Sequence, residues 1–308
     1  MFSLGDNYIL VNYHYVENPR PDKSGIHPCS IIEFEKQIKF LSENYNIVSI
    51  PEVFSSFNEN KTGKFCAVTF DDGLKDQYEN ALPILRKYNT VGTFFPITST
   101  FEGRLPATHK IHVLLSHTSP AELIKIFHGF IREFYPDLET IYSVPTDRRL
   151  FERRKHEDIS TANFKETMIG LPEDIKGRFL RYCFKMFHLD EKKISREIFM
   201  SEEELKEIYK KGMTIGSHSH GHYSMEAVSS DFMKKDIQLS CKILSEVIGN
   251  YAKIYSYSHG HNNKEGVKIL KDLGFEYGVT TIARAVTKDD SRFLLPRFDS
   301  NNIKDFLN

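Results

Sequence analysis

The sequence has little of several features that would define its class. Its four cysteines are scattered, without the Cys-x-x-Cys spacing of a structural zinc site, and they fit buried thiols better than a disulfide framework. No apolar run approaches the roughly 18 residues of a membrane helix. The first residues carry neither a basic segment nor a long apolar core. We therefore expect no membrane span, no signal peptide and a cytoplasmic location for the sequence as given.

The chain also lacks an excess of charge of either sign. Lys and Arg number 41, Asp and Glu number 42, and the formal net charge is -1. A balance of this kind gives no electrostatic footprint for nucleic acid or for an anionic membrane, so we expect neither as a partner. The 308 residues, 40% of them hydrophobic, can bury a sizeable core, and a substrate would be recognised locally in a pocket.

One stretch, Ala67–Gly73, organises the rest of the chain. A short apolar run ends abruptly in two adjacent carboxylates, Asp71 and Asp72, followed by a glycine. This order predicts a β-strand that delivers two acids to its carboxyl end, with Gly73 allowing a tight turn. The alternative is an ordinary Asp-Gly turn, which is common in proteins.

Short strands alternate with helices on both sides of this stretch. A helix is predicted to begin at Ser30 and another to follow the capping box that Ser201 forms with Glu204. This alternation indicates parallel βα units, whose catalytic residues gather at the carboxyl ends of the strands. The other predicted strands span residues 8–14, 46–50, 91–97, 213–216, 253–257 and 292–298, and further helices span 75–88 and the periodic set Ile237, Cys241, Leu244 and Ile248.

Between about residues 103 and 199 the chain is charged and helix-forming. We interpret this segment as an inserted helical subdomain or lid within a single domain that spans residues 1–308. Arg104 follows the strand at 91–97 closely, so it is a candidate for gripping a substrate.

A second chemically distinctive stretch is Gly216–His222, which offers imidazoles for a metal ion. His218 and His222 are four residues apart, so one helical turn would place both rings on the same face. Two imidazoles, one carboxylate and a water form a catalytic zinc arrangement. Asp71 or Asp72 would supply the carboxylate, and the other acid would be free to act as a base. A surface histidine cluster has the same spacing, but the pairing with Asp-Asp-Gly makes the signal specific.

These two stretches resemble known motifs. Thr69–Gly73 and His218–His222 are similar to the first two motifs of the polysaccharide deacetylase family, also called carbohydrate esterase family 4 or the NodB-homology enzymes. Tyr255–Gly260 resembles the third motif in the branch with an aromatic-Ser/Ala-Tyr-Pro-x-Gly form, and Leu295–Arg297 resembles its late Leu-Pro-Arg segment. The similarity covers roughly residues 8–100 and 200–300, and the helical segment lies outside it.

The resemblance implies an α/β fold, a distorted (β/α)-barrel of about seven strands. It also implies metal-dependent hydrolysis of an amide, with Asp71 as the base and a divalent ion, Zn2+ or else Co2+, Mn2+ or Ni2+, as cofactor. Arg297 would orient Asp71 and keep it ionised, unless it forms an ordinary surface ion pair. Tyr257 would shape the acyl pocket or offer its backbone N–H to the oxyanion. The implied metal ligands are Asp72, His218 and His222, and Ser219 would steady their loop.

The chain departs from the family pattern in two places. It contains no tryptophan, so the usual tryptophan after the third motif is missing, and nothing after Arg297 matches the terminal motif whose histidine protonates the leaving amine. The candidates for this acid are His259, His261, His14 and His27. His14 ends the first predicted strand and either reaches the active site or bonds a neighbouring loop. We expect substrate contacts from His14, Arg104, Tyr257 and His261.

We therefore expect a hydrolase that removes an N-acyl group, such as acetyl, from an amino sugar. Because the sequence shows no export signal and has a large insertion, we favour a soluble precursor such as a nucleotide-linked sugar in surface-glycan biosynthesis. One alternative is a deacetylase of a polymeric or oligomeric glycan. Another is a catalytically silent sugar-binding module that kept the fold. Nothing in the sequence predicts an oligomeric state.

Overall fold

The structure is a computed structural model that describes residues 7–21, 25–150 and 157–307. Residues 1–6, on which the prediction about a signal peptide rests, lie outside the described residues. The chain divides into two compact units. The first comprises residues 1–18, 28–104 and 192–308, and the second comprises residues 19–27 and 105–191.

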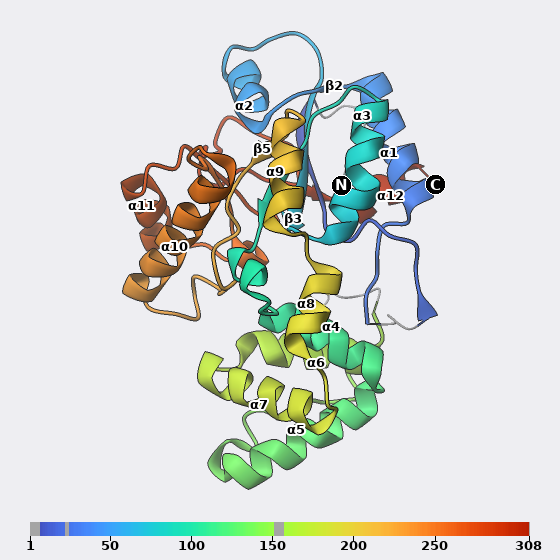
Figure 1. Cartoon of the computed structure of the whole chain (residues 1–308), viewed down its shortest axis with the longest axis vertical. Coiled ribbons are helices and arrows are strands. Elements are labelled where there is room, and N and C mark those ends of the chain that lie inside the picture. Colours follow the sequence, from blue (N-terminus) through green and yellow to red (C-terminus); the bar gives the residue numbers. More distant parts are fainter. Residues whose placement is uncertain (1–6, 22–24, 151–156, 308) are drawn as a thin grey trace. The chain divides into compact units, whose positions relative to one another are not determined.

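The larger unit is built on parallel strands, which Figure 1 shows at the centre of its helices. The main sheet has the order β5-β4-β3-β1-β8, and β6 pairs with β7 in a second sheet. Isolated parallel bridges join Ser217 to Tyr255 and Val279 to Leu295, so the two sheets close into one ring. The strands are β1 (Tyr8–Tyr13), β3 (Phe65–Asp72), β4 (Thr93–Pro96), β5 (Thr214–Ile215), β6 (Ile254–Ser256), β7 (Tyr277–Val279) and β8 (Phe298–Asp299), with β2 (Asn46–Ile47) paired to β3 outside the ring.

This ring confirms the predicted distorted parallel barrel of seven strands. The predicted strand at 292–298 is wrong in extent. The strand β8 begins only at Phe298, and before it Leu295 forms one isolated bridge with Val279. The short strand β7 was not predicted. Its sequence, Tyr-Gly-Val, is too short to give an alternating pattern.

Helices surround the barrel. Ser30 caps α1 as predicted, and Ser201 forms the predicted capping box with Glu204. The helix predicted at 75–88 divides into a π-helical turn, η2 (Gln77–Ala81), and α3. The helices of this unit are α1 (Ile31–Asn44), α2 (Ile50–Asn58), α3 (Leu82–Lys87), α9 (Glu202–Lys210), α10 (Ser230–Ile248), α11 (Lys264–Asp272) and α12 (Ser300–Leu307), with 3-10 turns η3 (Thr98–Glu102) and η6 (Ser258–Gly260). Helix α8 (Glu191–Ile198) begins at the boundary between the units.

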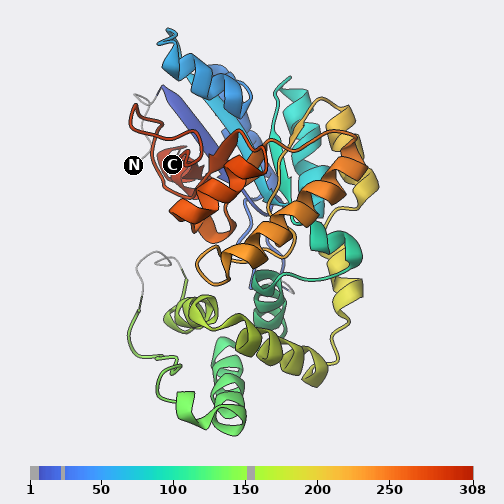
Figure 2. The same cartoon turned by 90° about the vertical axis from the view of Figure 1, so that its left-hand side faces the viewer.

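The second unit is helical, and Figure 2 shows its helices in green to olive colours. Three phenylalanine rings, from Phe127, Phe164 and Phe179, pack edge to face in its interior. Its elements are α4 (Ala107–His117), α5 (Pro120–Phe134), η4 (Pro136–Leu138), α6 (Ile159–Gly170) and α7 (Glu173–Met186). These helices lie within the range 103–199 predicted to be inserted, and the unit also includes residues 19–27. That this unit acts as a lid remains a prediction.

The barrel interior changes character along the strands. An apolar layer contains Leu10, Ala67, Ile254 and Leu295. Side chains on a strand alternate between its two faces, so residues two positions further on share the same interior. Those residues are polar and buried: Asn12, Thr69, Ser256 and Arg297. The strands therefore lead from a hydrophobic floor into a polar layer toward their carboxyl ends.

Candidate active site and metal centre

Asp71 and Arg297 form a buried ion pair at the carboxyl end of the barrel. The guanidinium donates from Nη1 to Oδ1 of Asp71 at 2.9 Å and from Nη2 to Oδ2 at 2.7 Å. Its Nε donates to the carbonyl of Thr280 at 2.9 Å, which fixes the guanidinium plane. Arg297 is 1% exposed and Asp71 is 2% exposed. The pair expected from the sequence is present, and the alternative of a surface ion pair is wrong.

Three neutral side chains complete this network. Asn12 donates from Nδ2 to Oδ2 of Asp71 at 3.0 Å, and Ser256 donates from its hydroxyl to Oδ1 at 3.0 Å. The hydroxyl of Thr69 donates to the carbonyl of Val11 at 2.8 Å and accepts from Nη1 of Arg297 at 3.1 Å. Asp71 thus accepts hydrogen bonds on both oxygens from groups on three different strands or loops.

The charge of Arg297 determines the protonation state of Asp71. Burial raises the pKa of the Asp71 carboxyl. The charge of Arg297, the charge of His218 and the hydrogen bond from Arg297 together lower it by more, so the pKa falls to about 2. A buried carboxylate next to an arginine is expected to behave in this way. Asp71 is therefore ionised at neutral pH.

Asp72, His218 and His222 form the second half of the site. Nε2 of His218 lies 3.5 Å from Oδ1 of Asp72, and Nε2 of His222 lies 3.7 Å from the same oxygen. One ligand atom from each residue lies within 4.8 Å of the other two. Among the described residues, this is the one group of three or more potential ligands that meets this distance limit.

The donor set fits a divalent ion. A tetrahedral zinc site with bonds of about 2.0–2.1 Å separates its ligand atoms by about 3.3–3.4 Å, close to the distances between these residues. Nδ1 of His218 bonds the carbonyl of Ser256 at 2.8 Å, which leaves Nε2 as the ligand nitrogen. Burial lowers the pKa of His218, but the charges of Asp71 and Asp72 and a hydrogen bond to Asp72 raise it above its usual value. The cluster therefore favours positive charge, as a cation site must.

The loop that carries both histidines is not a helix, contrary to the prediction. Ser219 and His222 have φ values of 66° and 59°, and an α-helix cannot continue through left-handed residues. The loop is held instead by specific bonds. The backbone N–H of His222 donates to the hydroxyl of Ser219 at 2.9 Å, so Ser219 steadies the loop as expected. The carboxylate of Asp236, on α10, accepts from the N–H groups of His220 and Gly221.

Left-handed backbone conformations concentrate in the site. Asp72 has φ 75°, and Gly73 has the same value. A Cβ at Gly73 would lie 2.8 Å from Cα of Pro96, so a glycine is required there. Seven non-glycine residues have positive φ in the described part of the chain, and four belong to this site: Asp72, Ser219, His222 and His259. Strain of this kind often accumulates where side chains are held for function.

The candidate acids occupy different positions. Nε2 of His14 lies 4.0 Å from Oδ2 of Asp71, and the His14 side chain is 43% exposed. The ring of His259 lies 4.6 Å from that of His222, centroid to centroid. His261 bonds the hydroxyl of Ser224 through Nδ1 at 2.9 Å, and its ring lies 5.8 Å from that of His259. His27 belongs to the other unit and is exposed.

Two predicted substrate contacts find other partners. The backbone N–H of Tyr257 donates to the carbonyl of Val279 at 3.1 Å, so it is not free to bind an oxyanion, whereas the other expected role of Tyr257, shaping the acyl pocket, remains a prediction. The Tyr257 ring packs in a hydrophobic cluster with Tyr255 and Phe275. Arg104 is exposed and pairs with Glu102 at 3.1 Å. Contact of Arg104 with a substrate remains a prediction.

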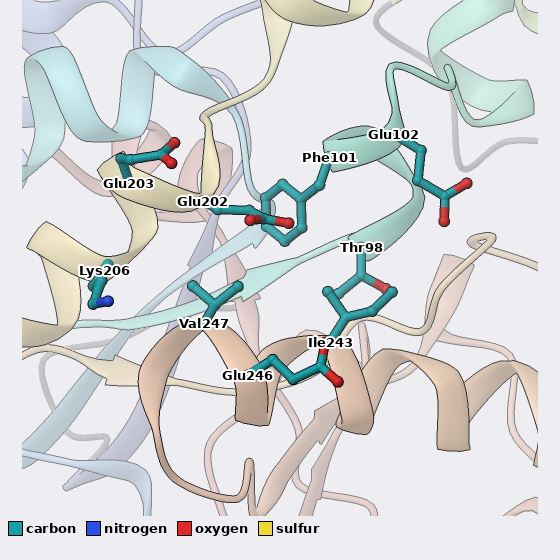
Figure 3. Close-up of a pocket in the computed structure, with 9 residues that line it drawn as sticks. All are labelled: Thr98, Phe101, Glu102, Glu202, Glu203, Lys206, Ile243, Glu246 and Val247. Atoms are coloured by element: carbon teal, nitrogen blue, oxygen red, sulfur yellow. The ribbon is translucent and has the colours of Figure 1, made fainter.

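A pocket of about 360 Å³ lies beside the histidine loop, between η3, α9 and α10 (Figure 3). Four of its nine lining residues are glutamates. Thr98 lines the pocket, and its hydroxyl lies 3.0 Å from Nδ1 of His220, which turns that ring away from the metal ligands. None of the residues predicted to act in catalysis or metal binding lines this pocket.

Sequence reasoning missed Asn12, Ser256 and Asp236. Asn12 stands two residues before His14, and Ser256 lies inside the third motif, so strand alternation could have placed both inside the barrel. Asp236 gave no such signal, because its role depends on α10 packing against the histidine loop.

The fold and the site together define a class: a parallel α/β barrel with an Asp-His-His cluster beside an arginine-bound carboxylate. The model of the polysaccharide deacetylase family matches residues 58–126 and 184–278, together more than half of the chain. The chain therefore belongs to the polysaccharide deacetylase family, a family of amide hydrolases, as its motifs indicate. The matched residues include Asp71, Asp72, His218 and His222 but not Arg297.

Individual relatives agree with this assignment. The putative polysaccharide deacetylase YxkH of Bacillus subtilis is 25% identical over 136 residues, which are 43% of this chain and 48% of that protein. The chain thus spans about half the length of this relative. The deacetylase PplD of Streptococcus pyogenes, solved in complex with acetate, has a TM-score of 0.62 at 16% identity over 97% of each chain. A de-N-acetylase from Aggregatibacter actinomycetemcomitans has a TM-score of 0.55 at 16% identity over 98% of this chain and 100% of that one.

In the described part of the chain, no helix combines the length and the apolar character that crossing a membrane requires.

Proposed function

We propose that this chain is a metal-dependent amide hydrolase that removes the N-acetyl group of an amino sugar in a glycan. The observation that carries the proposal is that an Asp-His-His cluster lies beside an arginine-bound carboxylate. The two carboxylates, Asp72 and Asp71, are adjacent residues of one strand. Membership of the polysaccharide deacetylase family supports the reaction class. The acetate in the PplD structure supports acetyl as the acyl group, because hydrolysis of an N-acetyl group releases that acid.

Hydrolysis adds water across the C–N bond of the amide. The oxygen of water bonds to the acyl carbon, one of its protons leaves for a base, and the nitrogen gains a proton as the bond breaks. Asp71 is the proposed base, since it is ionised and held in one orientation by Arg297. With a pKa of about 2, Asp71 is a weak base toward free water. The water must therefore be made more acidic.

Asp72, His218 and His222 would hold the divalent ion, for which we propose Zn2+. When bound, such an ion lowers the pKa of a coordinated water and polarises the acyl oxygen. The chain's own residues do the rest: they fix Asp71 beside this cluster and exclude solvent from both carboxylates, which are 2% and 5% exposed.

We propose His14 as the acid that protonates the departing nitrogen. Its Nε2 faces the Asp71 carboxylate at 4.0 Å, and its half-exposed ring stands at the carboxyl end of β1, where a substrate can reach it. His259 is the second candidate, because its ring packs edge-on against that of His222. The proposal favours His14, because it lies next to Asp71. The base that takes a proton from water and the acid that gives one to the nitrogen would then stand side by side.

The proposed substrate is a glycan or oligosaccharide rather than a free precursor. Both YxkH and the family model carry the description polysaccharide deacetylase, which supports a polymer. The prediction of a nucleotide-linked sugar remains open as the competing substrate class.

The test is acetate release by the purified chain from two probes, a pentamer of N-acetylglucosamine and UDP-N-acetylglucosamine. We expect stoichiometric metal in the protein, acetate release from the pentamer, its loss on treatment with dipicolinate and its return on adding Zn2+. Release from the nucleotide sugar alone would overturn the glycan proposal. Binding of the pentamer without any acetate release, in protein that contains metal, would instead support the catalytically silent module.

A further inference from the structure

Asn12 lies at the junction of the Asp71–Arg297 pair. Its side chain is 4% exposed, and it stands on β1 directly opposite Thr69 of β3 in the parallel register. Neither Asn12 nor Arg297 lies in the residues that the family model matches. Asn12 comes from the first described strand and Arg297 from the chain just before the last one, so the folded barrel alone brings them together.

The amide of Asn12 can adopt one orientation. Its Oδ1 accepts from Nη1 of Arg297 at 2.9 Å, while its Nδ2 donates to Oδ2 of Asp71 at 3.0 Å. A flipped amide would point N–H groups at the guanidinium, which has donors and no acceptor. It would also point its oxygen at a carboxylate. The surrounding groups therefore fix which end of Asn12 faces Asp71.

Four donors hold the Asp71 carboxylate: two N–H groups of Arg297, the hydroxyl of Ser256 and the amide of Asn12. The Asn12 bond falls on Oδ2, the oxygen that also faces His14 at 4.0 Å. Asn12 thus sets the rotation of the carboxylate about its Cβ–Cγ bond on the side where the proposed acid stands.

We propose that Asn12 is a positioning residue for the hydrolysis: its amide locks Asp71 and Arg297 in one relative orientation, so that the carboxylate is aimed at the attacking water. The inference rests on the function proposed above. A residue that acts in this way lowers kcat when it is removed but leaves KM and bound metal unchanged. Loss of an outer partner of a functional group typically costs 10- to 100-fold in activity.

The test compares Asn12→Ala and Asn12→Asp with the unaltered chain. Asn12→Asp keeps the shape and the acceptor oxygen but replaces the amide donor with a second carboxyl group beside Asp71, so it combines the loss of the donor with like-charge repulsion and provides a second variant if the alanine variant folds poorly. We expect both variants to lower kcat for acetate release from the N-acetylglucosamine pentamer by about 10- to 100-fold, with KM and metal content unchanged within about twofold. A kcat within threefold of the unaltered chain in the variants that fold would overturn the proposal, as would a loss that follows metal content.

A double-variant cycle separates positioning from general support of the fold. Asn12→Ala and Arg297→Lys act on one ion pair, so their combined loss in kcat should be well below the product of the single losses. Fully multiplicative losses would overturn the inference. The matched control is Asn163→Ala in the helical unit. Asn163 is also buried, and its amide donates to two backbone carbonyls at 2.7 Å, so its loss should lower stability without changing kcat.

A measurement that needs no substrate keeps this inference distinct from the proposed function. In 15N-labelled protein, the Nη–H signals of Arg297 should be sharp and individually resolved, because Asp71 and Asn12 hold the guanidinium in place. In Asn12→Ala they should broaden or average as the guanidinium gains freedom to rotate. If the unaltered chain releases no acetate from either probe, the proposed function fails. Unchanged Arg297 signals in Asn12→Ala would overturn the positioning role by themselves.

Discussion

Asp71 and Asp72 are adjacent in the chain, yet their surroundings are opposite in kind. Asp71 accepts hydrogen bonds from a guanidinium, an amide and a hydroxyl. The guanidinium is permanently charged and the other two groups are neutral. Asp72 faces two imidazoles, whose Nε2 atoms lie 3.5 Å and 3.7 Å from one of its oxygens. The chain itself neutralises the first carboxylate, whereas the second belongs to a cluster shaped for a cation.

The difference follows from the backbone. Asp71 ends the regular alternation of β3 and points into the barrel with Thr69, whereas Asp72 has a φ of 75° and leaves that alternation. One dipeptide can therefore supply two kinds of carboxylate, because a left-handed residue reorients the second. Four predictions test how separate the two regions are, from the largest expected effect to the smallest.

Replacing a residue of the Asp72 region should have the largest effect. His222→Ala removes one of three proposed ligands, so we expect the purified protein to lose bound metal and its acetate-releasing activity to fall below detection. Metal content is measured by inductively coupled plasma mass spectrometry. The control is His117→Ala, an exposed histidine at the end of α4, which should keep both. Stoichiometric, tightly held metal in His222→Ala would contradict the ligand role.

Replacing Asp71 should separate the two regions. Asp71→Asn removes the proposed base but no metal ligand, so we expect kcat to fall by about 10²- to 10⁴-fold while bound metal stays stoichiometric. Asp72→Asn should instead lose metal. If both variants lost metal equally, the two carboxylates would share one role and the contrast between them would be wrong.

The two candidate acids should differ in size of effect. We expect His14→Gln to lower kcat by about 10²-fold, since it removes the proposed proton donor. His259→Gln should lower it by less than about 10-fold, because the ring contacts His222 from outside the proposed ligand set. The measurement is kcat for acetate release at saturating pentamer. The reverse order of effects would assign the acid to His259.

The smallest effect concerns a second arginine–aspartate pair, formed by Arg284 and Asp290. Arg284 binds Asp290 through both guanidinium nitrogens, but the Arg284 side chain is 40% exposed. Burial raises the pKa of Asp290, but hydrogen bonds from Arg284 and Thr287 together lower it by more. The folded-state pKa is therefore below the usual value. Asp290→Asn should cost at most about 1 kcal/mol of unfolding free energy at pH 7.

The pH dependence of that cost has a definite sign. A lowered folded-state pKa contributes stability above the unfolded pKa of about 3.9, and the contribution disappears as pH falls through the folded value. Urea unfolding at pH 7 and pH 3 should therefore show a larger difference between the unaltered chain and Asp290→Asn at pH 7. A difference that grows on acidification would contradict the pairing.

The sequence alone predicts the part of this site that lies in short, distinctive motifs. The Asp-Asp-Gly and His-x-x-x-His stretches were recognisable because adjacent acids and spaced imidazoles are rare together. The spacing of the motif did not reveal that Ser219 has a left-handed backbone conformation. The loop is held by hydrogen bonds from its N–H groups to Asp236, and that residue lies on α10.

The residues that sequence reasoning missed share a cause. Asn12 and Ser256 are ordinary polar residues whose partners lie 59 and 185 positions away, so strand alternation could place them inside the barrel but could not identify their partners. Closure of the barrel gives them their roles. Similarly, β7 exists through its pairing with β6, and the chain before β8 meets it through the single bridge between Val279 and Leu295, so neither follows from strand propensity.

Arg297 has a consequence for how the molecule is made. It lies 226 positions after Asp71. During synthesis the earlier strands emerge and can begin to fold before the arginine has left the ribosome. Until it arrives, the Asp71 carboxyl lies in an unclosed barrel without its cation. A fragment ended at residue 278, where the family match stops, would keep both aspartates and both histidine ligands but could not form the ion pair.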